Sequence, residues 1–490
     1  MRTVSLLAAF GLVSSAFGAP SEAADAAQRR DWQALRALAG RHSDLNAPQT
    51  DGTTALEWAA HWNDVDAVKL LLSSGADPKV ANRYGVTPLS EAAAAGNAAI
   101  IEMLLQAGAD PKTFTTADGE TVLMIAARTG NVEAVKVLLA RGADANAKES
   151  YRGQTALMWA AAERHADVVK LLLERGADWK IQSLARETNI PKLSAASSVT
   201  PMARGGLTAF HFAAREGDIE TGRVMLDAGV DINQVDVDGT SGLVVSILNK
   251  RYSYAKFLLD RGADPNIADS RGHAALYAAV DMRNQDYSAL PAHKEDDPLP
   301  NLDLIKVLLA RGANPNAQLT KALPGRSGMD AGDTTLGPGS TPFMRAARAG
   351  DSLAMNALLE YGADPALATK DGNTALQFAA GVGYRDKNTK GSESEALEAV
   401  KLTVGLGLDI NRENDRGETA LHGAASRGAD TLVQYLADQG ASLNAKTKQG
   451  LTPLDFAMGK NVITQLPVPH NSTVALIRKL GGVEGKEAKP

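Results

Sequence analysis

Residues 155–178 read TALMWAAAERHADVVKLLLERGAD, and this stretch decides the fold. It opens on a Thr that can cap a helix and runs on to an Ala-Ala pair, whose small side chains let two helices approach closely. Apolar residues then stand at Val169, Leu172 and Leu173, a spacing that puts them on one face of a second helix. Gly-Ala-Asp at the end turns the chain. The stretch therefore predicts two short helices followed by a turn.

The same phrases return along almost the whole chain. Gly-Ala-Asp or a close variant begins at residues 75, 108, 142, 176, 229, 262, 312, 362, 407 and 440. Thr followed by Ala or Pro and an apolar residue begins at residues 54, 87, 155, 341, 419 and 452. Asp-Gly, a preferred tip of a tight hairpin, begins at residues 51, 118, 238 and 371. Phrases that recur in register indicate stacked repeats, none of which buries its apolar face without its neighbours.

The period of about 33 residues in the first units resembles that of the ankyrin-repeat family. The resemblance covers residues 26–482 and implies an all-α ankyrin-repeat solenoid, with a helix-turn-helix and a β-hairpin finger in each repeat. We count eleven repeats, which begin near residues 51, 84, 118, 152, 205, 238, 271, 339, 371, 416 and 449. Residues 155–178 also look like the corresponding stretch of exported bacterial members of the family.

The expected organisation follows the repeats. It consists of a signal peptide (1–24), an N-terminal capping half-repeat (25–50), repeats one to four (51–204), repeats five to seven (205–338), repeats eight to eleven (339–482) and a polar tail (483–490). Insertions interrupt the register at residues 183–204, 284–300, 320–338 and 384–395. Such insertions map to surface loops, and they are either tolerated variation or part of a binding face.

The N-terminal segment has the pattern of a secretory signal peptide. Arg2 supplies a positive charge, residues 4–17 are apolar and small, and small residues at Gly18 and Ala23 offer cleavage sites. The apolar run is too short for a comfortable membrane span, and no Cys follows it to carry a lipid. We expect an exported protein, periplasmic or secreted, with an uncleaved buried helix as the alternative.

Composition narrows the function classes. Only 5% of the residues are aromatic, which suits a stack of small helices better than one large core. The net charge of −6 argues against a nucleic-acid partner, because such proteins neutralise phosphates with a basic surplus. The chain has no cysteine, which excludes thiolate metal sites, disulfides and cysteine nucleophiles. We expect a monomer with no cofactor and no membrane insertion.

The familiar motifs of catalysis and metal binding are missing from the sequence. No His-Glu-x-x-His pair and no Gly-x-x-x-x-Gly-Lys-Ser/Thr phosphate loop occurs. The resemblance assigns His211 and His422 to a structural, hydrogen-bonding position of the repeat. We interpret the cluster of His293, Asp296 and Asp297 as a solvated loop. We therefore expect a protein that is not an enzyme and has no catalytic or metal-binding residue. The alternative, from another functional class, is an enzyme whose catalytic residues lie in the insertions.

The resemblance implies that a protein partner of unknown identity binds the concave face, at the fingertips and at the exposed ends of the inner helices. Large amphipathic side chains at these positions in repeats one to four are the candidate anchors, because aromatic residues and Arg dominate interface energetics. They are His61, Trp62, Arg83, Tyr84, Phe114, Arg128 and Tyr151. The alternative for Trp62 and Tyr84 is packing on the next finger.

Other rings are expected in the core, because they stand just before the Ala-Ala pair or its equivalent. They are Trp58, Trp159, Phe212, Phe378 and Phe456. The expected function is that of an exported, non-catalytic interaction scaffold, and a secreted effector acting on host proteins is the alternative.

Overall fold

The computed structural model describes residues 21–41, 43–114, 118–185, 205–284, 297–323, 336–384, 391–460 and 469–485. Within these ranges the chain forms 24 short helices, and the only β-structure consists of isolated bridges. The expected all-α repeat fold is confirmed. Residues 1–20 and most of the four insertions lie outside the described ranges.

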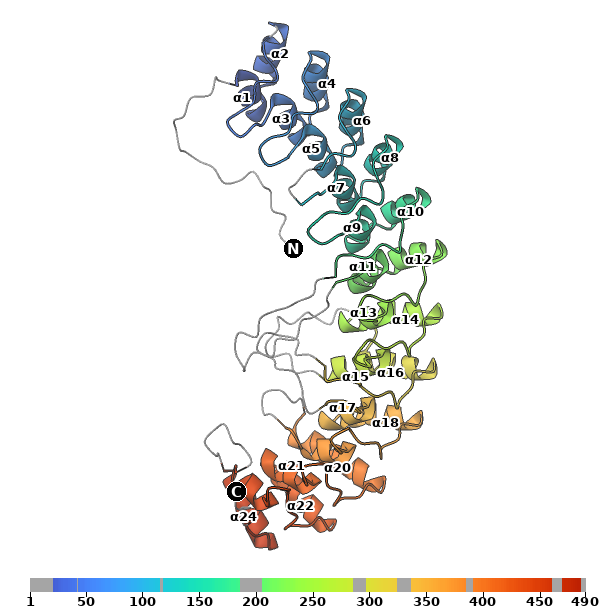
Figure 1. The fold of residues 1–490 in the computed structure, drawn as a ribbon, viewed down its shortest axis with the longest axis vertical. Coiled ribbons are helices and arrows are strands. Elements are labelled where there is room, and N and C mark those ends of the chain that lie inside the picture. The colour runs from blue at the N-terminus through green and yellow to red at the C-terminus, as the bar shows by residue number, and fades with distance from the viewer. Residues whose placement is uncertain are drawn as a thin grey trace. The chain divides into compact units, whose positions relative to one another are not determined.

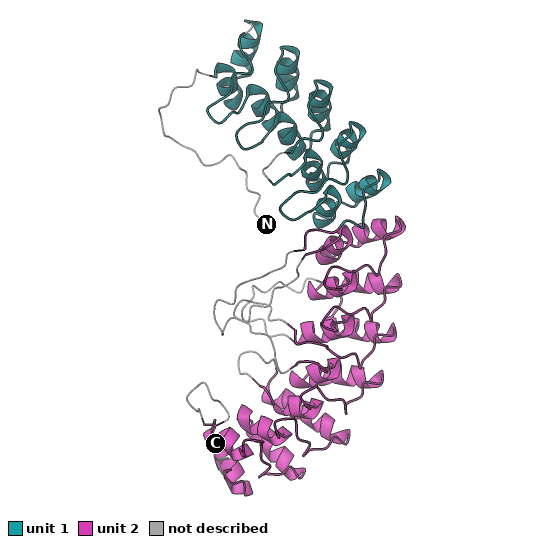
Figure 2. Cartoon of the chain, viewed as in Figure 1, with its two compact units in different colours: residues 1–181 teal, residues 182–490 magenta. Residues whose placement is uncertain are grey.

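The chain divides into two units, residues 1–181 and 182–490 (Figure 2). The helices of unit 1 are α1 (Glu22–Gln28), α2 (Trp32–Gly40), α3 (Ala55–His61), α4 (Val65–Ser73), α5 (Pro88–Ala94), α6 (Ala98–Gln106), α7 (Val122–Thr129), α8 (Val132–Ala140), α9 (Ala156–Ala162) and α10 (Ala166–Glu174). The odd-numbered helices pack on one another in one row and the even-numbered helices in another (Figure 1). We call them the inner and the outer helices.

Unit 2 repeats the same arrangement of inner and outer helices. Its helices are α11 (Ala209–Glu216), α12 (Ile219–Asp227), α13 (Gly242–Leu248), α14 (Tyr252–Asp260), α15 (Ala275–Arg283), α16 (Asn301–Ala310), α17 (Pro342–Arg348), α18 (Ser352–Glu360), α19 (Ala375–Ala380), α20 (Glu393–Gly405), α21 (Ala420–Arg427), α22 (Asp430–Asp438), α23 (Pro453–Ala457) and α24 (Asn471–Leu480). Over the described residues no helix has the length and apolar character that crossing a membrane requires.

The inner helices α3, α5, α7 and α9 begin where the sequence places a capping Thr. In unit 1 the side chains of Thr54, Thr87, Thr121 and Thr155 accept a hydrogen bond from the backbone N–H three residues on. A cap of this kind satisfies one of the unpaired N–H groups at a helix start and contributes about 1 kcal/mol. The recurring Thr therefore fixes where every repeat of unit 1 enters its inner helix.

The core lies between neighbouring inner helices and between the two rows. Ala59, Ala60, Val68 and Leu71 are fully buried in the first repeat, as the apolar pattern predicts. Four of the five rings expected in the core are buried there. These are Trp58, Phe212, Phe378 and Phe456. The fifth prediction was wrong, because Trp159 is only half-buried.

Short fingers join consecutive repeats, and in unit 1 we number them by residues: finger 1 (47–54), finger 2 (80–87), finger 3 (113–121) and finger 4 (147–155). Backbone hydrogen bonds link the tips of fingers 1 and 2, where Arg83 N donates to Asp51 O at 2.8 Å, and those of fingers 3 and 4, where Ser150 N donates to Asp118 O at 2.6 Å. The tip of finger 1 requires glycine, since Gly52 has a φ of 94° and a Cβ there would lie 3.0 Å from the Cα of the next finger's Asn82.

The N-terminal end of unit 1 carries a helix pair, α1 and α2, where the sequence predicts a capping half-repeat. Helix α1 buries Ala23, Ala24, Ala26 and Ala27 and packs on α3. Residues 22–24, which fall within the expected signal peptide, thus belong to a packed helix.

Candidate partner-binding surface

Finger 2 holds its tip in place with a single buried side chain. The Oδ1 atom of Asn82 accepts hydrogen bonds from Tyr84 N at 2.9 Å and Val86 N at 3.1 Å, and its Nδ2 donates to Glu57 Oε1 at 2.7 Å. Tyr84 is left 56% exposed at the tip. The Arg83 guanidinium lies 5.0 Å from the centre of the Tyr84 ring, a cation–π distance.

Finger 4 reaches a similar arrangement with a different residue. The buried carboxylate of Glu149 accepts from Tyr151 N at 2.7 Å, Arg152 N at 2.8 Å and Gln154 N at 2.9 Å. Tyr151 is 52% exposed, and the Arg152 guanidinium lies 5.5 Å from its ring centre. We call Arg83 with Tyr84 and Arg152 with Tyr151 the two fingertip pairs.

Finger 3 presents a ring on which no charged group of the described residues is stacked. Phe114 is 58% exposed, and its backbone forms an isolated β-bridge with Thr121. In chain order this ring stands between the two fingertip pairs, and all three exposed rings occur among the predicted anchors.

His61 and Trp62 do not join the fingertip pairs. Trp62, the C-cap of α3, is half-buried, and its ring stacks on Trp58 at 6.0 Å and under the Arg30 guanidinium at 4.1 Å. His61 Nδ1 lies 2.9 Å from the carboxylate of Glu91 on the next inner helix. The structure therefore places these two predicted anchors in a packed cluster between α1, α3 and α5.

Arg128 lies at the exposed end of α7, as predicted, and its guanidinium is 5.0 Å from the ring centre of Trp159. The sequence analysis did not predict two residues that lie on the same surface as Arg128, namely Arg152 and Trp159. Arg152 was missed because it is an extra residue before the turn glycine of finger 4, and Trp159 was assigned to the core. We call fingers 1–4 and the inner-helix ends beside them the finger face.

A buried acid lies beneath the finger face. Glu57 is 4% exposed, and burial, reinforced by the charges of Glu91 and Asp51, raises its pKa to about 8. Its Oε2 atom is buried without a hydrogen-bond partner among the described residues. Glu57 stands three residues after Thr54, a position the sequence argument could have singled out, because two repeats of unit 2 fill it with histidine.

Those histidines are structural, as expected. His211 is fully buried, and its Nδ1 accepts from the Thr208 side chain at 2.8 Å while its Nε2 donates to Thr240 O at 3.1 Å. Burial lowers the pKa of His211 to about 4. His422 makes the equivalent bonds to Thr419 and Leu451 O.

The only described member of the predicted polar cluster, Asp297, also has a structural role. Its carboxylate accepts from Ser253 N at 2.9 Å and from Ser253 Oγ at 2.6 Å, which caps the start of α14. His293 and Asp296 lie outside the described residues. Within the described ranges, no group of three or more His, Asp and Glu side chains could hold a metal ion.

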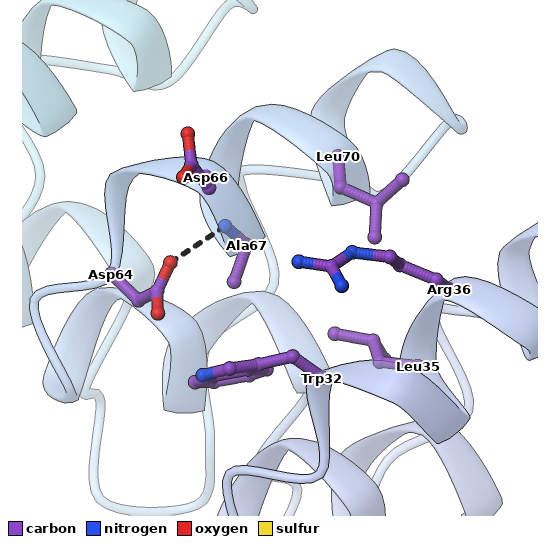
Figure 3. Close-up of a pocket in the computed structure, with 7 residues that line it drawn as sticks. All are labelled: Trp32, Leu35, Arg36, Asp64, Asp66, Ala67 and Leu70. Carbon is purple, nitrogen blue, oxygen red and sulfur yellow. Dashed lines mark hydrogen bonds between the residues drawn. The ribbon is translucent and has the colours of Figure 1, made fainter.

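A cavity of about 300 Å³ opens between the outer helices α2 and α4. Trp32 and Arg36 of α2 face Asp64, Ala67 and Leu70 of α4 across it (Figure 3). Asp64 accepts from Ala67 N at 2.8 Å, so its carboxylate is used as a helix cap. The cavity is formed by outer helices, whereas the fingers connect to the inner helices. It is therefore not part of the finger face.

Comparison with protein families gives one kind of match throughout. A model described as ankyrin repeats (3 copies) matches residues 24–115, 107–183, 192–269 and 210–319, more than half of the chain. Models described as ankyrin repeats (many copies) and ankyrin repeat match residues 404–457 and 338–370.

Two curated proteins and one solved structure illustrate the similarity. The ankyrin repeat protein YahD of Escherichia coli is 29% identical over 189 residues, 36% of this chain and 89% of that protein. The human transient receptor potential cation channel subfamily A member 1 is 26% identical over 250 residues, 51% of this chain but only 19% of the channel. The crystal structure of the human ASB11 ankyrin repeat domain aligns with a TM-score of 0.41 and 24% identity, covering 50% of this chain and 98% of that domain.

Proposed function

This chain belongs to the ankyrin-repeat family, and from that premise we propose that it binds a protein partner through the finger face of unit 1. Ankyrin repeats are typically protein–protein interaction scaffolds and generally non-catalytic, and the three family models reported above are ankyrin models. The observation that carries the proposal is the pair of exposed Arg–Tyr fingertips, each held outward by a buried side chain of its own finger.

The exposure of these rings supports an interface. Tyr84, Phe114 and Tyr151 each leave about half of a large amphipathic side chain in water, and Tyr and Arg are the residues most enriched among interface anchors. Adjacent helices pack about 10 Å apart, so four repeats present a surface about 40 Å long. That length is ample for a standard interface of about 800 Å² per partner. Because the tips are preorganised, binding loses little conformational entropy.

We also propose that the protein is exported before it binds. The apolar run of residues 4–17 behind Arg2 supports a cleavable signal peptide. Because α1 begins at Glu22 and buries Ala23 and Ala24, cleavage after Gly18 leaves this helix intact, whereas cleavage after Ala23 removes part of it. N-terminal sequencing of the mature protein should therefore start at Ala19, and recovery of an intact Met1 would contradict export.

Site-specific photo-crosslinking tests the binding surface. A photoreactive phenylalanine analogue is placed at position 84, 151 or 361, and the protein is irradiated in its native compartment. Tyr361 is the matched control, because its ring is 45% exposed but stands in the turn after the outer helix α18 of unit 2. We expect a protein adduct from positions 84 and 151 and none from position 361. Equal labelling at all three positions, or none at 84 and 151, would refute the proposed surface.

A further inference from the structure

We propose that the partner presents an extended acidic segment whose carboxylates bind Arg83 and Arg152, with an apolar residue between them on Phe114. This inference rests on the function proposed above and names the chemistry of the partner.

The two fingertip arginines are available for a ligand. Neither the Arg83 nor the Arg152 side chain forms an ion pair with any carboxylate among the described residues. Two arginines that follow outer helices behave differently, since Arg261 pairs with Asp227 at 2.6 Å and Arg311 pairs with Asp260 at 2.6 Å. The free positive charge of the finger face is thus concentrated at its tips.

Stacking on tyrosine prepares each guanidinium for a carboxylate. Each guanidinium lies over a tyrosine ring, and both arginines are exposed to solvent. The guanidinium N–H groups form a fork that matches the two oxygens of a carboxylate. Because the ring already restrains the arginine, less side-chain entropy is lost on binding than for a free arginine.

The repeat spacing sets the distance between the two carboxylates. Fingers 2 and 4 are two repeats apart, which corresponds to about 20 Å at about 10 Å per repeat. An extended chain advances about 3.3 Å per residue, so the two acidic residues should stand about six positions apart. Phe114, on finger 3, then meets the residue midway between them.

The acidic groups of the finger face sharpen this pattern. Asp118 is exposed on finger 3 with Phe114, so it disfavours a third carboxylate at the middle position and leaves an uncharged apolar residue as the better fit. Asp51 at the tip of finger 1 disfavours further acidic residues beyond Arg83. Arg128 lies in the field of Glu120 and is less available than the fingertip arginines. The net charge of −6 disfavours a nucleic acid, whose phosphates would also meet arginine and tyrosine.

The test measures fluorescence anisotropy of the full chain with a labelled peptide that contains Glu-Ser-Ser-Leu-Ser-Ser-Glu. The control peptide carries Gln at both Glu positions, and a second control places the two Glu residues three positions apart. We expect the first peptide to bind at least about tenfold more tightly than either control, with an advantage that shrinks as salt is added. Equal binding of the Gln peptide overturns the proposed chemistry, and equal binding of the close-spaced peptide overturns the proposed geometry. No binding of any peptide also overturns the proposal.

Variants of the protein locate the interaction. The double variant Arg83→Gln, Arg152→Gln should bind the acidic peptide no better than the Gln peptide. Arg261→Gln is the matched control, because Arg261 is an exposed arginine 5.9 Å from the centre of the Phe257 ring but is already ion-paired. A similar loss in Arg261→Gln would refute the site, and displacement of the peptide by a single-stranded RNA at lower concentration would favour a nucleic acid instead. If crosslinking at positions 84 and 151 persists while the peptide fails, the partner is a protein of different chemistry. If the crosslinks fail as well, the proposed function fails with it.

Discussion

The two units differ in several repeats at the position three residues after the N-cap of the inner helix. In unit 2, His211, Gln377 and His422 use this position to donate a hydrogen bond to a carbonyl of the next finger or its approach. In unit 1 the same position holds Glu57, Ser90, Met124 and Met158. Ser90 bonds only within its own turn, and the two methionine thioethers offer no donor.

The difference shows two ways of fixing fingers on one repeat scaffold. Three repeats of unit 2 hold the next finger with a buried side chain of the preceding inner helix. Finger 4 of unit 1 is shaped instead from within, by Glu149, whereas finger 2 is shaped by its own Asn82, which also donates to Glu57 of α3. Unit 1 also carries three exposed finger rings, whereas the exposed ring described in unit 2, Tyr361, lies off the fingers. Unit 1 is therefore the part of the chain whose fingers combine preorganised tips with exposed anchors.

The largest effect should come from removing the packing of unit 1. Trp58 is 6% exposed, stacks on Trp62 and donates to Gln49 Oε1 at 2.9 Å. Trp58→Ala should lower the free energy of unfolding of unit 1 by about 3–5 kcal/mol. Because a repeat array couples mainly neighbours, we expect two thermal transitions, of which only one shifts. A single transition that is coincident by fluorescence and circular dichroism would show that the units unfold together.

A smaller loss is expected when unit 2 is given the side chain of unit 1. His211→Met leaves the buried Thr208 N without its acceptor and removes one of the two hydrogen bonds to Thr240 O, which should cost about 3 kcal/mol at pH 8. The wild-type bond also depends on pH, because the folded pKa of His211 is about 4 and its ordinary value is 6.5. The unfolded state binds the proton first, so this contribution is complete above pH 6.5 and is lost as the pH falls toward 4.

Thermal unfolding of wild type and His211→Met between pH 4 and 8 measures both effects. The difference between the two proteins should narrow as the pH falls. A difference that is constant over this range would mean that His211 does not remain neutral in the folded protein. Met124→Leu in unit 1 is the control and should show no such pH dependence.

The stability contributed by Glu57, the buried acid of unit 1, should depend on pH in the opposite direction to that contributed by His211. The folded pKa of Glu57 is about 8 against an ordinary 4.5, so the folded state keeps the proton longer and stability falls as the pH rises from 4.5 to 8. Glu57→Gln keeps an acceptor for Asn82 and removes the charge. It should stabilise unit 1 by about 2 kcal/mol at pH 9 and have no effect at pH 4. Equal stabilisation at both pH values would assign the gain to packing rather than to charge.

The smallest effect on stability is expected at the fingertips. Tyr84→Ala and Tyr151→Ala remove exposed rings and should each change the free energy of unfolding by no more than about 0.5 kcal/mol. The same pair should weaken partner binding by at least about 2 kcal/mol if the rings are anchors. Early melting of the double variant would show that the rings support the fold, and normal affinity would exclude them from the interface.

Periodicity made the fold and the exposed rings predictable. Tyr84, Phe114 and Tyr151 each stand before the turn glycine of their finger, by one, five and two residues, so the repeat register placed all three on the fingers. Trp62 was harder to place, because Arg30, which covers its ring, follows α1 and lies outside the repeat pattern. The surroundings of Trp62 depend on the helix pair α1 and α2, whose sequence lacks the recurring phrases of the repeats.

Residues at equivalent positions of two repeats can also differ in burial, and the sequence of a single repeat does not predict this difference. Trp58 and Trp159 occupy the same place in their repeats, yet Trp58 is enclosed by Gln49 and Trp62 while Trp159 meets Arg128 at the edge of the surface. Burial at this position is decided by the neighbouring side chains, and those are set by tertiary packing rather than by the local pattern.

The backbone links between fingertips have a consequence for how this surface can change over generations. Arg83 N to Asp51 O and Ser150 N to Asp118 O use main-chain atoms alone, so the alignment of neighbouring tips is indifferent to which side chain each tip displays. A substitution at residue 84 or 151 can therefore alter partner preference while leaving the scaffold that presents it in register. The fingers of unit 1 thus form a surface whose binding specificity can change through substitutions that are nearly neutral for folding.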